Sequence, residues 1–140
     1  MLLNLGLSGV PFCGADVGGF HDNTTPELLA RWTQLACLTP FFRNHSDIGT
    51  IGQEPWAFGA RIEEICRRYI QLRYQLLPYL YRLFVEAHRH GTPIMRALMW
   101  HYQNDPKAVA AGDQFMVGAD LLVAPIATGR GRVRADFHSS

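Results

Sequence analysis

Residues 11–23 read PFCGADVGGFHDN, and this stretch decides the fold class. An apolar run ends at the acid Asp16, and Gly18 and Gly19 then precede the aromatic Phe20. A short apolar run that ends in glycine and aspartate is typical of a buried strand leading into a loop. The two glycines permit positive φ and a close backbone approach, which aims the Phe20 ring instead of burying it in the next element. An ordinary core position for Phe20 and a capping role for Asp16 stay open as alternatives.

The residues that follow predict a helix and a second strand. Thr25 fits an N-cap, Pro26 the first helical position and Glu27 the first turn. Apolar residues then recur at 3–4 spacing as far as residue 38 and include Leu28, Leu29, Trp32, Leu35 and Ala36. TPFFRNH, residues 39–45, is another short apolar run that ends in polar residues. Strand, helix and strand at this spacing predict a βαβ unit, and hence an α/β fold with two parallel strands.

Parallel strands end at the same edge of a sheet, so we expect the loops after Asp16 and Arg43 to face one crevice. Ligands bind at that edge in open α/β sheets and in barrels. The loop after the second strand reads NHSDIGTIGQEPW, residues 44–56. Its candidate side chains are His45, Asp47, Glu54 and Trp56. Loops this rich in glycine and polar residues either line a site or serve as plain connections.

A long helix is predicted over residues 57–90. Its apolar stripe consists of Ile62, Ile65, Tyr69, Leu72, Leu76, Leu80, Leu83 and Ala87. Pro78 must break or kink the helix, because it removes one backbone hydrogen bond and clashes with the preceding turn. Gly91 fits the C-cap.

The chain changes character near residue 93, where a β-rich module is predicted to begin. TPIMRALMWHY, residues 92–102, is strand-like, and NDPKAVAAGD, residues 104–113, indicates a loop or a short turn. QFMVGADLLVAPI, residues 114–126, holds two short apolar runs around a turn. At the other end, residues 1–15 are apolar, and we expect the chain to start inside a core strand.

Composition excludes several classes of protein. The 140 residues are 48% hydrophobic and carry a net charge of +1, which gives no electrostatic footprint for nucleic acid or an anionic membrane. The arginine cluster within residues 130–134 is typical of a solvated tail. Three cysteines without a close pair predict free thiols. No apolar run approaches a membrane span, and the N-terminus lacks the basic region of a signal peptide, which favours a cytoplasmic location.

No pattern for a metal, a cofactor or a serine nucleophile is present. The histidines lack a third ligand at a familiar spacing, GADVGG does not match the dinucleotide fingerprint, and no G-x-S-x-G elbow occurs. Four carboxylates are candidates for the crevice edge, and their mutual distances stay open: Asp16, Asp22, Asp47 and Glu54.

Four blocks, in order, resemble the family 31 glycoside hydrolases, the α-glucosidase family. They are GLSGVPFCGADVGGF at residues 6–20, ELLARWTQLACLTPFFRNH at 27–45, RYIQLRYQLLPYLYRLFVEAHRHGTPIMRALMW at 68–100 and DQFMVGADLLVAP at 113–125. The resemblance implies a (β/α)8 TIM barrel followed by C-terminal β-sandwich domains. It also implies retaining hydrolysis of terminal α-glycosidic bonds through two aspartates, with an α-linked oligosaccharide or glucoside as substrate.

The resemblance also implies roles for four residues. Phe20 matches the position whose ring walls the sugar subsite, and His45 matches the histidine that hydrogen-bonds a hydroxyl of that sugar. Asp16 and Arg43 match polar positions beside the subsite. A ring would supply an apolar face for the sugar while neighbouring polar groups take its hydroxyls.

The blocks imply the last two β/α units of the barrel over residues 1–92 and the start of the proximal β-sandwich domain over residues 93–140. Both catalytic aspartates of the family precede these blocks, and no residue here matches either one. We therefore expect a truncated reading of a longer gene, whose isolated product is inactive. The alternative is a non-catalytic carbohydrate-binding or interaction module. The choice of α-glycoside stays open, since α-xylosidases share the family.

Overall fold

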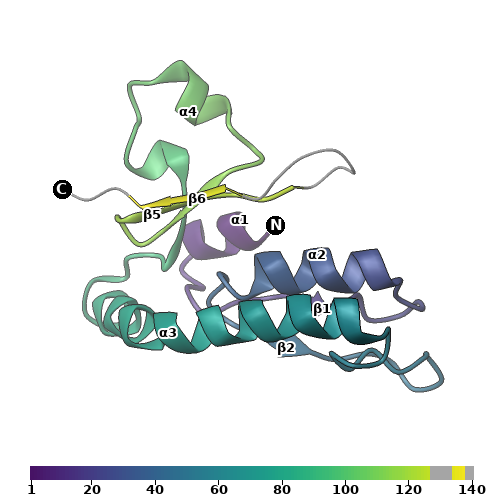
Figure 1. The fold of residues 1–140 in the computed structure, drawn as a ribbon. Helices are drawn as coiled ribbons and strands as arrows, with labels where there is room; N and C mark the ends of the chain where they lie inside the picture. Colours follow the sequence, from purple (N-terminus) through teal and green to yellow (C-terminus); the bar gives the residue numbers. More distant parts are fainter. Residues whose placement is uncertain (127–133, 138–140) are drawn as a thin grey trace. The chain divides into compact units, whose positions relative to one another are not determined.

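A computed structural model describes residues 1–126 and 134–137 (Figure 1). Its contacts divide the chain into two compact units. We call Gly14–Tyr79 the strand–helix unit, and Met1–Cys13 with Leu80–Ser140 the sheet unit. The strand–helix unit contains β1 (Asp16–Val17), α2 (Pro26–Ala36), β2 (Arg43–Asn44) and the first part of α3 (Ala60–His90). The sheet unit contains α1 (Leu2–Leu7), the end of α3, β3 (Met95–Ala97), the 3₁₀ turn η1 (Leu98–Trp100), α4 (Pro106–Ala110), β4 (Phe115–Val117), β5 (Leu121–Ala124) and β6 (Arg134–Phe137).

The two strands of the strand–helix unit are parallel, as predicted. Asp16 pairs with Arg43 and Val17 with Asn44. Each strand has only two residues, so the longer strand expected over the apolar run before Asp16 is wrong. The backbone at Gly14 explains the difference, because a Cβ there would lie 2.1 Å from the carbonyl oxygen of Phe41. At this point the two segments touch backbone to backbone, closer than a strand with side chains allows.

Helix α2 follows its sequence signals. The Thr25 hydroxyl accepts a hydrogen bond from the backbone N–H of Leu28 at 3.2 Å, and Pro26 occupies the first turn. The helix ends at Ala36, two residues before the predicted end. Its buried face is made by Leu29, Ala30, Thr33 and Ala36. Leu28 was expected on that face and is exposed instead.

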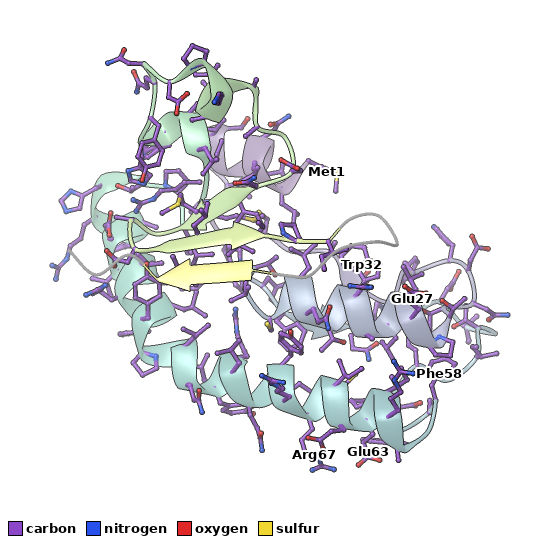
Figure 2. The ribbon with its side chains drawn as sticks, turned by 45° about the horizontal axis from the view of Figure 1, so that its top comes forward. Met1, Glu27, Trp32, Phe58, Glu63 and Arg67 are labelled. Atoms are coloured by element: carbon purple, nitrogen blue, oxygen red, sulfur yellow. The ribbon has the colours of Figure 1, made fainter. Side chains whose placement is uncertain are left out.

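The core of the strand–helix unit joins β1, α2 and α3. Its buried residues are Val17, Leu29, Ala30, Ala36, Ile62 and Cys66. Trp32 of α2 and Phe58, just before α3, pack against this cluster, and Figure 2 shows both helices running alongside each other here. This packing positions the ends of β1 and β2, from which the loops depart.

Helix α3 begins at Ala60, three residues after the predicted start, and ends at His90 as predicted. The helix runs through Pro78, so of the two predicted outcomes the break is wrong, and the kink stays a prediction. The predicted stripe is buried at Ile62, Leu80, Leu83 and Ala87 and partly buried at its other positions. Gly91 has φ +70° and donates its N–H to the Ala87 carbonyl at 2.9 Å, which confirms the C-cap.

The sheet unit confirms the β-rich module. Its four strands are antiparallel in the order β3-β4-β5-β6, and Gly118 opens the turn between β4 and β5. The strand predicted over residues 92–102 is wrong beyond Ala97, where η1 begins. The loop predicted over residues 104–113 contains α4, capped by the Asp105 carboxylate, which accepts from the Lys107 N–H at 2.8 Å.

The N-terminus forms helix α1, so the expectation of a core strand there is wrong. Gly6 is buried, and a Cβ on it would lie 3.2 Å from both the Met95 carbonyl oxygen and Pro93 Cβ. This small residue lets the helix lie close to the start of β3 within the sheet unit. Of the predicted arginine tail at 130–134, all but the backbone of Arg134 lies outside the described residues.

Candidate functional site

Asp16 and Arg43 are the first residues of β1 and β2 and face each other. Arg43 Nε donates to Asp16 Oδ1 at 2.8 Å, and Arg43 Nη2 lies 2.6 Å from the same oxygen. The Asp16 side chain is 20% exposed and the Arg43 side chain 50% exposed. The sequence predicted that both lie at one edge, and the structure brings them into direct contact. The carboxylate is therefore engaged by an opposite charge.

Phe20 and His45 come together beyond those strands, three residues after the end of β1 and one residue after the end of β2. Gly18 (φ +90°) and Gly19 (φ +93°) turn the chain with positive φ, as their sequence suggested, and leave the Phe20 ring 36% exposed. The Phe20 ring centroid lies 5.4 Å from that of the His45 imidazole, with the planes tilted by 37°. A partly exposed aromatic ring thus lies beside a side chain whose ring nitrogens donate and accept hydrogen bonds.

Backbone and side-chain contacts tie the loops after β1 and β2 to each other. The Asp47 N–H donates to the Phe20 carbonyl at 2.8 Å, and the Ile51 N–H donates to Asn23 Oδ1 at 2.8 Å. His21 Nδ1 lies 3.5 Å from Asp47 Oδ2. Sequence reasoning singled out Asp47 only as a candidate carboxylate. Its backbone role beside Phe20 has no sequence signal, because it depends on where two separate loops meet.

Gln53 is a further residue that sequence reasoning missed. Its Nε2 donates to the Val17 carbonyl and to Asn44 Oδ1, both at 2.9 Å, and Asn44 Nδ2 donates to the Gln53 carbonyl at 2.7 Å. The side chain therefore joins the last residues of β1 and β2. A glutamine within a polar loop looks like any solvated residue in the sequence, so nothing could have indicated this position.

The loop after β2 lines an open hollow of about 520 Å³. Its lining combines side chains that bind hydroxyl groups with backbone, and includes Asn44, His45, Asp47, Thr50, Gln53 and Glu54. Of the four predicted site residues, His45 lines this hollow, whereas Asp16, Arg43 and Phe20 do not. Trp56 was also a candidate in this loop and does not line it; its side chain is 67% exposed.

Within residues 1–126 and 134–137, no group of three His, Cys, Asp or Glu side chains is placed to hold a metal ion. Over the same residues, no helix has the length and apolar character needed to cross a membrane.

Two family models match the chain. The glycosyl hydrolases family 31 TIM-barrel domain matches residues 1–83, and the glycosyl hydrolase family 31 C-terminal domain matches residues 91–137. The chain belongs to glycosyl hydrolase family 31. The resemblance carried by the four sequence blocks is confirmed, and so are the TIM-barrel and C-terminal domains that it implied.

Several members of family 31 are similar to this chain along nearly its whole length. Alpha-glucosidase 2 of Bacillus thermoamyloliquefaciens is 57% identical over 128 residues, which cover 91% of this chain and 16% of the relative. The family 31 dextranase of Flavobacterium johnsoniae, solved with glucose, has a TM-score of 0.85 at 41% identity and covers 90% of this chain and 16% of its own. A family 31 α-xylosidase from a soil metagenome, solved with xylose, has a TM-score of 0.85 at 32% identity, over 94% of this chain and 23% of its own. The chain therefore spans about a sixth to a quarter of the length of these relatives.

Proposed function

We propose that this chain is the C-terminal part of the catalytic barrel of a retaining glycosidase that hydrolyses terminal α-glycosidic bonds of the α-glucoside type. In this proposal it contributes sugar-binding residues and not the two catalytic aspartates. The observation that carries it is the Phe20 ring 5.4 Å from the His45 imidazole, beyond the ends of two parallel strands, in a family 31 chain. Ligands of barrel enzymes bind at that end of the strands.

Each proposed site residue has a role that its chemistry supports. The exposed Phe20 ring supplies an apolar wall for one face of the sugar, and a His45 ring nitrogen hydrogen-bonds a hydroxyl group. Asp16 and Arg43 form a charged pair beside this subsite, where the half-exposed guanidinium keeps N–H groups available to solvent or sugar. The substrate is an α-linked oligosaccharide or glucoside.

The same proposal assigns the architecture in finer detail. Residues 1–92 are the last two β/α units of the barrel, and residues 93–140 begin the proximal β-sandwich. The parallel β1–β2 pair with its helices, followed by an antiparallel sheet from β3 onward, supports this division.

Chemistry argues that the isolated chain does not turn over substrate. Retaining hydrolysis needs one carboxylate as nucleophile and a second as acid/base, about 5–5.5 Å apart. Two of the four candidate carboxylates are engaged by other groups: Asp16 by Arg43, and Asp47 by His21 and the Ile48 N–H. Residues that hold the sugar cannot replace the covalent step or the proton transfer.

The proposal is tested in an intact enzyme in which the 128 matched residues of this chain replace the corresponding segment of the Bacillus α-glucosidase. We expect this chimera to hydrolyse a chromogenic α-glucoside. His45→Ala should lower kcat/KM about fivefold or more, since one neutral hydrogen bond is worth about 1 kcal/mol and strengthens if it forms mainly in the transition state.

The matched control is His90→Ala, which removes an exposed imidazole at the end of α3. It should leave kcat/KM unchanged. An inactive chimera, or equal values of kcat/KM for the chimera and its His45→Ala variant, would contradict the proposed subsite.

A further inference from the structure

Gln53 is buried in a loop whose other side chains are largely open to solvent. Its exposure is 5%, whereas Asp47, Ile48 and Ile51 of the same loop are exposed. A buried carboxamide must find hydrogen-bond partners, because an unsatisfied amide costs about 1–3 kcal/mol. We therefore expect the Gln53 carboxamide to have specific partners, unlike the solvent-exposed side chains of the same loop.

Both hydrogens of the Gln53 amide are used at the junction of the two strands. One is donated to the Val17 carbonyl, the last backbone group of β1, and the other to Asn44 Oδ1, at the end of β2. The bond from Asn44 Nδ2 back to the Gln53 carbonyl closes this connection. The amide oxygen lies against the next residue of the turn, since a Cβ on Gly18 would come within 2.9 Å of Gln53 Oε1.

These contacts fix the segments that carry the two proposed sugar-binding rings. Phe20 follows Val17 by three residues through a flexible pair of glycines, and His45 follows Asn44 directly. Two glycines at positive φ leave the Phe20 ring poorly defined unless a neighbour holds the turn. The Gln53 amide contacts the turn at its start, and the Asp47 N–H holds it at Phe20.

We propose that Gln53 is a positioning residue of the sugar subsite: its buried carboxamide sets the Val17–Phe20 turn and Asn44 in one register, which holds the Phe20 ring against the His45 imidazole. This inference rests on the proposed function for its consequence in catalysis, and on geometry alone for the positioning itself.

The positioning is measured on the 140-residue chain by NMR. At a centroid separation of 5.4 Å, Phe20 ring protons and His45 ring protons should give a nuclear Overhauser effect (NOE). Gln53→Ala should abolish that NOE while amide shifts in α2 and α3 stay in place. Gln71→Ala, the same change at an exposed glutamine of α3, should retain it.

Gln53→Glu is the second variant, because it keeps the side-chain volume. A carboxylate donates nothing to the Val17 carbonyl, so the NOE should again be lost. Retention of the NOE in both variants would overturn the inference. Loss of the whole spectrum in both variants would also overturn it, since Gln53 would then support the fold and not the geometry of two rings.

The catalytic consequence is measured in the chimera described above. Gln53→Ala should lower kcat/KM at least about fivefold, because displacing a positioned group by about 1 Å costs up to about a hundredfold. If Gln53 acts through the two rings, adding Gln53→Ala to a variant that already lacks both the Phe20 and the His45 ring should lower kcat/KM by no more than about twofold. Losses that multiply would overturn the inference, whereas a His45→Ala variant with full activity would contradict the proposed function instead.

Discussion

Cys37 is the residue whose surroundings most change its chemistry. The side chain is fully buried beyond the end of α2, and its Sγ donates to the Gln34 carbonyl at 3.3 Å. Burial raises the pKa of the Cys37 thiol to about 12, and the nearby Arg73 guanidinium partly offsets this. The thiol is therefore neutral and unreactive across the physiological range, in line with the free thiols expected from the sequence.

The raised pKa of the Cys37 thiol predicts that the free energy of unfolding falls at alkaline pH. An unfolded thiol loses its proton near pH 9, while the folded thiol keeps it up to about 12. The contribution of the Cys37 thiol to the free energy of unfolding is fully present below pH 9. It is lost as the pH rises towards 12, by up to about 1.4 kcal/mol per pH unit. In urea unfolding at pH 7 to 10.5, the free energy of unfolding should fall more steeply with pH for the unsubstituted chain than for Cys37→Ala. Parallel declines would contradict the buried thiol.

For individual residues, the sequence predicted that Asp16 and Arg43 lie at one edge of the sheet, because parallel strands end at the same edge. It also predicted the turn at Gly18 and Gly19, because glycine is the residue that adopts positive φ at little cost. It could not predict the buried Gln53, whose role depends on the path of the loop between β2 and α3. Short-range patterns carry no information on such paths.

Among the elements, the junction between α2 and β2 depends on α3. Arg73 Nη1 donates to the Cys37 carbonyl at 3.1 Å and to the Thr39 carbonyl, and Nη2 donates to the Pro40 carbonyl at 2.8 Å. Carbonyl groups after a helix end have no partner within the helix. Burial lowers the pKa of Arg73, and the guanidinium still satisfies three carbonyls at once.

We therefore expect Arg73→Met to destabilise the chain by about 2 kcal/mol, because hydrogen bonds to a charged group contribute about 1.5–3 kcal/mol. The matched control is Arg68→Met, an exposed arginine of the same helix, which should change the free energy of unfolding by less than about 0.5 kcal/mol. The urea midpoints of the three proteins measure this. Equal losses of unfolding free energy in the two variants would show that the Cys37, Thr39 and Pro40 carbonyls find other donors.

The elements also show where sequence patterns suffice. Helix α3 was predicted within three residues because its stripe persists over many turns, and α2 because its cap and proline are adjacent. Helix α4 was missed although Asp105 and Pro106 carry the same start signals, since five residues show no period. Helix α1 was missed because a short apolar run has no feature that separates a helix from a buried strand.

For the whole molecule, the share of its relatives' length that the chain covers bears on activity. The chain covers 16% of the Bacillus relative, and its parallel pair has two residues in each strand. Complete TIM barrels use about 250 residues and draw catalytic side chains from several strands. The described part of this chain holds the ends of two parallel strands.

We accordingly expect the purified 140-residue chain to show no turnover of a chromogenic α-glucoside, whereas the chimera hydrolyses it under the same conditions. The reason lies in the proposed function, in which this chain does not supply the two carboxylates that retaining hydrolysis needs. Release of the chromophore is followed over hours with a buffer blank. Turnover that disappears in Asp16→Asn would show that the catalytic pair lies within this chain.

Gly14 has a consequence for variation at that position. With 2.1 Å between a Cβ there and the Phe41 carbonyl oxygen, alanine already collides with main chain, which cannot rotate out of the way as a side chain would. Every larger residue meets the same obstacle. In a library randomised at this codon, we therefore expect the folded variants to retain glycine. Because glycine has no Cβ, the two segments can approach closely enough to keep Asp16 in register with Arg43.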